Sequence, residues 1–480
     1  MPACARHGDG VAMTGTREGA ITRARAQFDQ GGFRATLAAL IAIPSTSQEA
    51  AHRADLDRYL DGALKPWLAR LGFAVTIHPN PAADAGPILL ARRREGEALP
   101  SVISYGHGDT VRGFAPEWSE GLDPWQLTER DGLWYGRGTA DNKGQHALNL
   151  AALEAVLAER GGRLGFNLAL VIETAEERGS AGLREFVAAH RELLAADVLI
   201  GSDGPRVMPD LPTICTGTRG TFHFDLVVAL RQGGVHSGHW GGLTRDPAII
   251  LAHALAAIMD RNGRILVPGW TPPGGMPEAV RRVLSGCPLG GGGEAATIDD
   301  GWGEPGLTPA EKVYGWNSFI VLAMVSGKPD GPVNAVAPEA RAHCQLRYTV
   351  DTDQALFASS LRRHLDACGF PEVRIEHAGT RMPASRTDPD NPWVRFVSGS
   401  IMRTLGRAPQ VIPNSSGGLP GEVFVDHLGV PLVWIPHSYT GCRQHGPDEH
   451  VVPATLREGI AMMAGLWWDL GAGDTPNRGR

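Results

Sequence analysis

The stretch from residue 102 to residue 200 decides the fold class, because short apolar runs alternate there with helical ones. The runs VISY (102–105), NLALVI (167–172) and DVLI (197–200) are typical of buried strands. Between them, QHALNLAALEAVLAER (145–160) has the period of a helix, and 180–195 is helical again. This alternation predicts an α/β domain with a mostly parallel sheet.

The same pattern extends to both ends of the chain. Upstream, we predict amphipathic helices over 21–43 and 55–72. Downstream of residue 388 the α/β pattern returns. We predict helices over 393–405, 420–428 and 453–470 and a strand over 432–435.

The middle third of the chain follows a different order. Strands over 221–230, 317–326, 341–350 and 372–376 and helices over 246–259 and 353–367 follow the order β-α-β-β-α-β, which predicts a ferredoxin-like α+β module. A Gly/Pro-rich stretch, 267–307 with GGGG at 290–293, is expected to be an insertion loop. We therefore predict one discontinuous α/β domain from residues 1–215 and 388–480, with an inserted domain over 216–387.

Composition excludes several classes of protein. The 480 residues are 42% apolar and 20% charged with a formal net charge of −7, which indicates a globular chain. No Lys/Arg block and no membrane-length apolar run is present, so neither a nucleic-acid partner nor a membrane is expected. The six cysteines are scattered without a CxxC pair and the first residues lack the apolar core of a secretory signal, so a cytoplasmic protein is expected.

Acids and histidines follow the predicted strands at the point where each strand ends. The residues are His107, Asp109, Glu176, Glu177, Asp203 and His445, and Asp141 lies in a Gly-rich loop before a helix. In open α/β sheets, ligands bind beyond the carboxyl ends of strands. Two histidines with several carboxylates suit a pair of divalent ions such as zinc, although each acid taken alone is also an ordinary turn residue.

Six motifs occur in an order that resembles the M20 family of metallopeptidases, which includes carnosinase-like dipeptidases, carboxypeptidase G2 and acetylornithine deacetylase. The motifs are GHGDT (106–110), GRGTADNKG (136–144), TAEERGS (174–180), SDG (202–204), VHSGHWGG (235–242) and QHGPDEH (444–450). The resemblance covers the chain from about residue 35 to its end. It implies a catalytic domain that binds two zinc ions and an inserted lid domain that often dimerises.

The resemblance also implies roles for the residues at the strand ends. Asp141 resembles the ligand that bridges two ions, and its peptide bond to Asn142 is expected to be cis. One ion is then completed by His107 and Asp203, and the other by Glu177 and His445. Glu176 resembles the general base, and Asp109 the carboxylate that orients His107. Zinc is the expected metal, with manganese or cobalt as alternatives.

Four further residues resemble the family's substrate contacts. His236 matches a histidine that crosses the dimer interface and stabilises the oxyanion, and Arg347 matches an arginine that binds a substrate carboxylate. Asn334 matches a contacting segment, although Ala335 could hold the position instead. The loop SSGGLP (415–420) departs from the carnosinase-like pattern, because Gly418 stands where a serine is expected. This departure puts a simple transfer of dipeptide specificity in doubt.

The function predicted is metal-dependent hydrolysis of an amide bond in a small carboxylate-bearing substrate, with a dipeptide as the first choice. An N-acyl-amino-acid amidohydrolase or deacetylase is the alternative, and a non-hydrolytic metal-binding protein is a more remote one. No GxSxG elbow is present for a serine hydrolase. A homodimer formed through the lid is the expected assembly.

Overall fold

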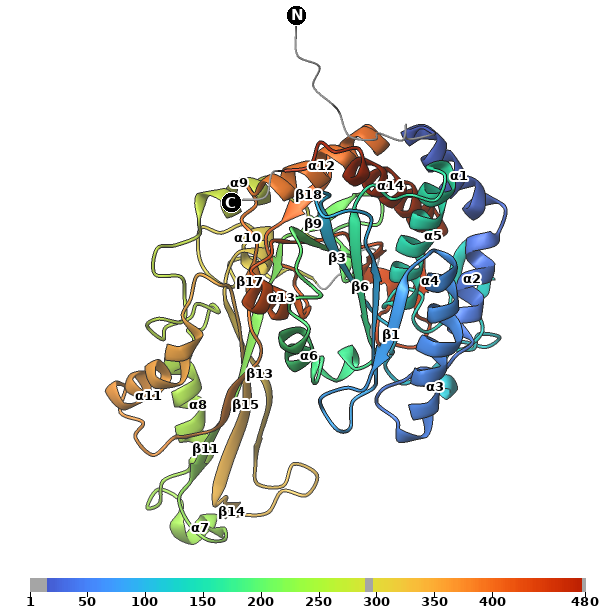
Figure 1. Cartoon of the computed structure of the whole chain (residues 1–480). Coiled ribbons are helices and arrows are strands. Elements are labelled where there is room, and N and C mark those ends of the chain that lie inside the picture. Colours follow the sequence, from blue (N-terminus) through green and yellow to red (C-terminus); the bar gives the residue numbers. More distant parts are fainter. Residues whose placement is uncertain (1–14, 290–296, 477–480) are drawn as a thin grey trace, which may run out of the picture. The chain divides into compact units, whose positions relative to one another are not determined.

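The structure is a computed structural model that describes residues 15–289 and 297–476 (Figure 1). The chain divides into two compact units. Unit 1 comprises residues 1–212, 392–409 and 435–480, and unit 2 comprises residues 213–391 and 410–434. The GGGG run at 290–293 lies outside the described residues. Each unit is described below by itself.

The sheet of unit 1 contains five strands in the order β1-β2-β6-β3-β7. They are β1 (Ala74–His78), β2 (Ile88–Arg93), β3 (Ser101–His107), β6 (Asn167–Glu173) and β7 (Val198–Gly201). Strand β3 is parallel to β6 and β7, because crossover segments connect these strands. Strands β1 and β2 are antiparallel to each other, and β2 is antiparallel to β6. The sheet is therefore mixed, and the prediction of a mostly parallel sheet is wrong at this edge.

Helices surround the sheet of unit 1. They are α1 (Arg17–Asp29), α2 (Gly32–Ile41), α3 (Arg53–Asp57), the π-helical η2 (Arg58–Leu64), α4 (Lys65–Arg70), α5 (Lys143–Glu159), α6 (Leu183–Ala189), α12 (Pro392–Leu405) and α14 (Pro453–Gly471). The single helix predicted over 21–43 is divided into α1 and α2. Gly31 separates them with a φ of 81°, a left-handed conformation that ends one helix and begins the next.

Two small sheets in unit 1 hold the loops that carry the candidate site. Strands β4 (Thr128–Arg130), β5 (Leu133–Tyr135) and β21 (His450–Val451) form one of them. Strands β8 (Pro205–Arg206) and β20 (Ser438–Tyr439) form the other. The loop after β5 is thereby tied to the segment before β21, and the loop after β7 to the segment that leads to His445.

Unit 2 is built on the four-stranded antiparallel sheet β13-β15-β11-β16. The elements run in the order β11 (Gly220–Ala229), α8 (Pro247–Ile258), β13 (Ser318–Ser326), β15 (Glu339–Tyr348), α11 (Phe357–Ala367) and β16 (Arg374–Met382). This is the order β-α-β-β-α-β read from the sequence. Helices α8 and α11 pack on one face of the sheet around a core that includes Phe222, Trp270 and Phe357 (Figure 1).

Local sequence signals explain the helix starts in unit 2. Asp246 caps α8 by accepting a hydrogen bond from the N–H of Ala248, with Pro247 as the first helical residue. The Gly/Pro-rich stretch 267–307, expected to be a loop, contains the helix α9 (Glu278–Leu284). The remaining α-helices and strands of unit 2 are β9 (Thr213–Cys215), β10 (Gly217–Thr218), β12 (Val235–His236), α7 (Ser237–Trp240), α10 (Pro309–Tyr314), β14 (Ala335–Val336), β17 (Ser385–Arg386), β18 (Gln410–Ile412), α13 (Gly421–Leu428) and β19 (Leu432–Trp434).

Among the described residues, no helix combines the length and the apolar character that crossing a membrane would require.

A buried ionic network joins α1, α12 and α14 in unit 1. The Asp469 carboxylate accepts hydrogen bonds from the Arg17 guanidinium at 2.9 and 3.1 Å, from Ser400 Oγ at 2.6 Å and from Arg403 at 2.8 Å. Burial raises the pKa of Asp469, but these donors outweigh it and hold the pKa below its ordinary value of 3.8. The network therefore stabilises the fold at neutral pH, and its contribution is lost as the pH falls through the lowered pKa.

Asp469→Asn should lower the free energy of unfolding by about 2 kcal/mol at pH 7, because charge-assisted hydrogen bonds are lost in a buried position. The difference between wild type and variant should narrow as the pH falls below 3.8. Urea unfolding of both proteins at pH 7 and at a pH below 3.8 measures this difference in the free energy of unfolding.

Asp29→Asn is the matched control, because Asp29 also joins α1 to α14 through Arg457 but at an exposed position. It should cost less than about 1 kcal/mol. An equal cost for both variants would show that burial of the network contributes nothing.

Candidate metal centre

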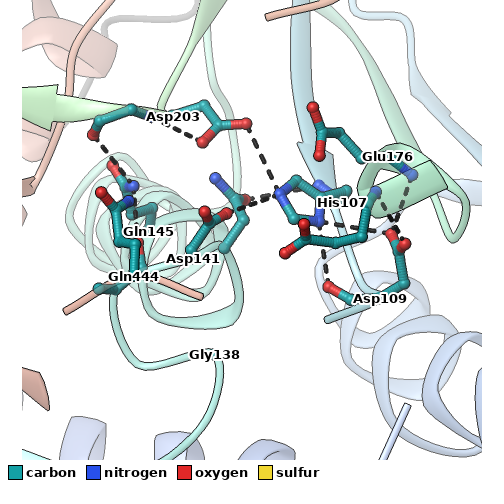
Figure 2. Close-up of polar contacts among 12 residues, drawn as sticks. His107, Asp109, Gly138, Asp141, Gln145, Glu176, Asp203 and Gln444 are labelled. Atoms are coloured by element: carbon teal, nitrogen blue, oxygen red, sulfur yellow. Dashed lines mark hydrogen bonds and ion pairs between the residues drawn. The ribbon is translucent and has the colours of Figure 1, made fainter. Parts of the chain in front are cut away.

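The ends of three parallel strands and three loops bring the predicted acids and histidines together in unit 1 (Figure 2). His107 is the last residue of β3, and Asp203 follows β7 by two residues. Glu176 and Glu177 begin the 3-10 helix η4 (Glu176–Arg178), which follows β6. Asp141 lies in the loop before α5. His445 lies in the loop between β20 and β21.

The five predicted ligands form two trios that share Asp141. His107 Nε2 lies 2.9 Å from Asp141 Oδ1 and 3.7 Å from Asp203 Oδ2. His445 Nε2 lies 3.2 Å from Asp141 Oδ2 and 3.1 Å from Glu177 Oε2. Each oxygen of Asp141 therefore faces one trio, and the candidate ligand atoms within each trio lie within 4.8 Å of one another. The Asp141–Asn142 peptide bond is cis, as predicted.

Two carboxylate oxygens of this cluster have no hydrogen-bond partner although they are buried. They are Glu177 Oε1 and Asp203 Oδ2. A buried carboxylate oxygen without a donor is costly, unless a cation or a proton compensates it. One such oxygen lies in each trio, and the donor set of imidazole nitrogen and carboxylate oxygen is one that divalent zinc, manganese or cobalt accepts. The residues present therefore fit a pair of divalent cations.

The electrostatics of the cluster indicate an excess of buried negative charge. Burial raises the pKa of Glu177 to about 7 and that of Asp203 to about 6, and the nearby Asp141 adds to both shifts. Burial likewise raises the pKa of Glu176. Hydrogen bonds to Asp141 and Glu177 raise the pKa of His445 to about 11. Glu176, Glu177 and Asp203 thus hold protons more tightly than usual, first because they are buried and second because like charges surround them. At Asp141, burial is outweighed by hydrogen bonds with His107 and His445, which instead lower the pKa.

Hydrogen bonding leaves one nitrogen of His107 as a ligand. Its Nδ1 lies 3.0 Å from the backbone carbonyl oxygen of Asp109, and a carbonyl can only accept. Nδ1 therefore carries the proton, and Nε2 points at Asp141 and Asp203. Asp109 was expected to orient His107 through its carboxylate, but Asp109 Oδ1 is farther from Nδ1, at 3.4 Å. The backbone carbonyl makes the shorter contact.

The Asp109 carboxylate also holds the loop that carries the two glutamates. It accepts hydrogen bonds from the backbone N–H of Glu176 at 3.2 Å and of Glu177 at 3.1 Å, and from Ser47 Oγ at 2.6 Å. Asp109 is fully buried, so these bonds form away from water. Its position fixes where the first turn of η4 begins.

Glu449 is a residue whose part in the site we did not predict, although it lies within the motif QHGPDEH. Its carboxylate is fully buried and accepts four hydrogen bonds from the loop before α5. The donors are Arg137 at 2.7 Å and the backbone N–H groups of Gly138, Ala140 and Asp141, at 3.0, 2.9 and 3.1 Å. Its place in the same motif as His445 was the only signal in the sequence, because the donors lie more than 300 residues away from Glu449 along the chain.

A second unpredicted carboxylate, Glu173, supports the loop that carries Glu176 and Glu177. It is buried at the end of β6 and accepts hydrogen bonds from the Tyr105 hydroxyl at 2.7 Å and from Ser180 Oγ at 2.8 Å. Burial raises the pKa of Glu173 to about 7. The bond to Ser180 closes the loop that contains Glu176 and Glu177.

The other four predicted residues lie in unit 2, in two separate places. His236 pairs with Ala335 between β12 and β14, and the carbonyl of Asn334 accepts a hydrogen bond from the N–H of Ser237 at 2.9 Å. His236 and Asn334 are both exposed. They are therefore neighbours at one end of the unit.

Arg347 and Gly418 lie close to each other elsewhere in unit 2. The Arg347 guanidinium donates to the carbonyl of Ser416 at 3.0 Å, in the same loop as Gly418. A Cβ atom at Gly418 would come within 2.0 Å of Met382 Sδ. The Met382 side chain thus occupies the space that a side chain at position 418 would enter.

Comparison with known proteins identifies the family. Residues 103–469 match the model of peptidase family M20/M25/M40. The cysteinylglycine-S-conjugate dipeptidase of Corynebacterium striatum is 32% identical over 404 residues, which are 81% of this chain and 85% of that protein. The β-Ala-His dipeptidase of Rattus norvegicus is 37% identical over a shorter segment, 38% of this chain and 37% of that protein.

Solved structures agree on the fold. Human carnosine dipeptidase 1 superposes with a TM-score of 0.74 at 23% identity, over 96% of this chain and all of that chain. The M20 family metallo-carboxypeptidase Sso-CP2 from Sulfolobus solfataricus superposes with a TM-score of 0.75 at 23% identity, over 92% of this chain and 99% of that chain. The resemblance inferred from the six motifs is confirmed, and the chain belongs to peptidase family M20/M25/M40.

Proposed function

We propose that this peptidase hydrolyses dipeptides with two divalent metal ions, zinc first and manganese or cobalt as alternatives. The observation that carries the proposal is the position of Asp141, whose two oxygens each face a different trio of ligand atoms. His107 and Asp203 would hold one ion with Asp141, and Glu177 and His445 the other. Ions bound there would supply Lewis acidity that polarises the scissile carbonyl and acidifies the attacking water.

Glu176 is the general base of the proposed reaction. Its carboxylate is half-buried and makes no hydrogen bond to another described residue, so both oxygens are available to a proton. Asp109 holds its backbone N–H and thereby sets its direction. Glu176 takes the proton of the water that attacks the carbonyl and then delivers a proton to the leaving amine, as a base with a raised pKa can do near neutral pH.

A dipeptide is preferred as the substrate because the similar proteins from Corynebacterium striatum and Rattus norvegicus are named dipeptidases. The alternative is an N-acyl-amino-acid amidohydrolase or deacetylase, for which Arg347 would bind the same free carboxylate. The two differ in whether a free α-amino group is required. The site has no described residue that decides this, so the first experiment compares the two classes of substrate.

We further propose that residues 1–215 and 388–480 provide the catalytic domain and 216–387 the lid, and that two lids form a homodimer. Strand β13 lies at the edge of the unit 2 sheet and exposes a run of apolar side chains. An exposed apolar edge strand is a template for pairing with another chain. The run contains Ile320, Val321, Leu322, Met324 and Val325.

The position of His236 supports a role in the partner's site. Arg347 pairs with Thr221 near the start of β11, whereas His236 follows the other end of that strand. The ten residues of β11 span about 30 Å at about 3.3 Å each. A dipeptide is far shorter, so His236 and Arg347 of one chain cannot contact the same substrate. His236 is then available to stabilise the oxyanion of the partner's reaction.

A cytoplasmic location completes the proposal. The five described cysteines are free thiols, which suits a reducing compartment.

The first experiment is a substrate panel of free dipeptides and of N-acetyl, N-benzoyl and N-carbamoyl amino acids, with added zinc, manganese or cobalt and a chelator control. Mass spectrometry should detect cleavage of dipeptides that stops on chelation. Glu176→Gln should abolish turnover by at least about a thousandfold while two metal ions still bind, because a general base contributes on this scale.

Three results would contradict the proposal. Retained activity in Glu176→Gln would remove this residue as the base. Cleavage confined to the blocked substrates would make the enzyme an amidohydrolase. Silence across the panel with two ions bound would favour a metal-binding protein without hydrolytic activity.

Glu449→Gln should weaken metal binding about 10- to 100-fold, because an amide nitrogen cannot accept the N–H groups that hold the Asp141 loop. Competition with a fluorescent chelator measures this. The matched control is Glu95→Gln, since Glu95 also accepts two backbone N–H groups and an arginine in unit 1. The control should lose stability and keep its metal affinity. Equal metal affinity in both variants would contradict the role assigned to Glu449.

Leu322→Lys should convert the dimer to a monomer of 51.1 kDa, because a charge on the edge strand blocks strand pairing. Light scattering after gel filtration measures the mass, and Leu193→Lys in unit 1 is the control with a similarly exposed leucine. Turnover should fall with the dimer.

Mixing His236→Ala with Glu176→Gln subunits tests directly whether His236 of one subunit acts in the site of its partner. Each mixed dimer holds one complete site, so an equal mixture should regain about one quarter of wild-type turnover. A fully active monomer, or a mixture that stays inactive after the subunits have exchanged, would rule out this assembly.

A further inference from the structure

Unit 2 contains two arginines whose positive charges lie close together. Arg219 lies between β10 and β11 and is only 6% exposed. Arg347 lies on β15 and is partly buried. Ser318 connects them, because it pairs with Arg347 across the strands and its Oγ accepts a hydrogen bond from Arg219 at 3.3 Å.

The two arginines also contact the same loop. The backbone N–H of Arg219 donates to the carbonyl of Ser415 at 3.4 Å, and the Arg347 guanidinium donates to the carbonyl of Ser416 at 3.0 Å. Gln345 Oε1 accepts a further hydrogen bond from Arg347 Nε at 3.1 Å, which fixes the plane of that guanidinium. The pair is therefore part of one local structure.

Neither guanidinium has a negatively charged partner among the described residues, and Arg219 Nε is buried without any acceptor. Burial, together with the like charge of Arg347, lowers the pKa of Arg219 to about 9. A buried charge is normally paired, because the energy of removing it from water is large.

Two other buried arginines among the described residues follow that rule. Arg137 pairs with Glu449 and Arg206 with Glu458. The partly buried Arg386 pairs with Asp351. Arg160 has no carboxylate partner, but it donates to two backbone carbonyls. Among the described residues, the Arg219 side chain donates a hydrogen bond to the Ser318 hydroxyl alone. This arrangement is typical of a guanidinium that binds an anionic ligand.

We propose that Arg219 and Arg347 together form a carboxylate site, and that its ligand is the free carboxylate of the peptide substrate. The assignment of the ligand rests on the proposed function, whereas the anion site itself does not. A carboxylate offers two oxygens with about four lone pairs, enough to accept from both guanidinium groups. Arg219 is then a specificity residue that makes the enzyme prefer a free acid to its amide.

The kinetic test compares a dipeptide with its C-terminal amide. In wild type the acid should be preferred, and Arg219→Gln should raise the KM for the acid at least about tenfold with little change in kcat, because one charge-assisted contact to the substrate is lost. The KM for the amide should stay unchanged. Arg219→Lys should restore part of the preference, and guanidinium ion added to Arg219→Ala should restore part of the activity.

The matched control is Arg386→Gln in the same unit. Arg386 is paired with Asp351 by two hydrogen bonds of 2.7 and 2.6 Å, so its loss should lower stability and leave the preference for the acid unchanged. Arg219→Gln should not lower stability, because it removes an unpaired buried charge. Its melting temperature without substrate should equal or exceed that of wild type.

A binding measurement separates this proposal from the peptidase activity. Sodium acetate should raise the melting temperature of the wild type more than sodium chloride at equal ionic strength. The increment should disappear in Arg219→Gln and persist in Arg386→Gln. An increment that survives in Arg219→Gln would overturn the anion site. A lost increment with an unchanged preference between acid and amide would overturn the assignment to the substrate carboxylate.

Discussion

The structure of the candidate centre depends on one electrostatic constraint, the burial of several carboxylates beside only two imidazoles. Glu177 and Asp203 each leave a buried oxygen without a donor, and their pKa values are raised by burial and by Asp141. Like charges in a water-poor site repel strongly, so such a cluster is stable only with protons or cations among its members. A chain that folds around this cluster is therefore built to bind cations.

Two other carboxylates show how the chain holds the cluster in place. Asp109 and Glu449 accept hydrogen bonds from backbone N–H groups, and each thereby holds a loop that carries a candidate ligand. The acids of the site thus divide into those that face the cations and those that hold the loops.

This division explains what could be predicted from the sequence. His107, Asp141, Glu177, Asp203 and His445 are recognisable because they follow strands or occupy Gly-rich motifs, which are local features. The role of Glu449 depends on donors more than 300 residues away, so no local pattern contains it. The antiparallel edge formed by β1 and β2 was also missed, because strand direction depends on how the chain returns and not on composition. The break at Gly31 is local, but the apolar period continues through it.

Unit 2 buries an unpaired positive charge at Arg219, where unit 1 buries unpaired carboxylate oxygens. Arg219 lies outside the six motifs, and only the structure shows that it is buried without a carboxylate. Each unit thus buries charge of one sign that its own residues do not neutralise. Ligands that bind only the folded chain restore the lost stability by mass action, so sites of this kind persist although they weaken the empty protein. Stability measured with and without ligand should therefore distinguish such residues from ordinary buried ion pairs, whose removal weakens the protein in either state.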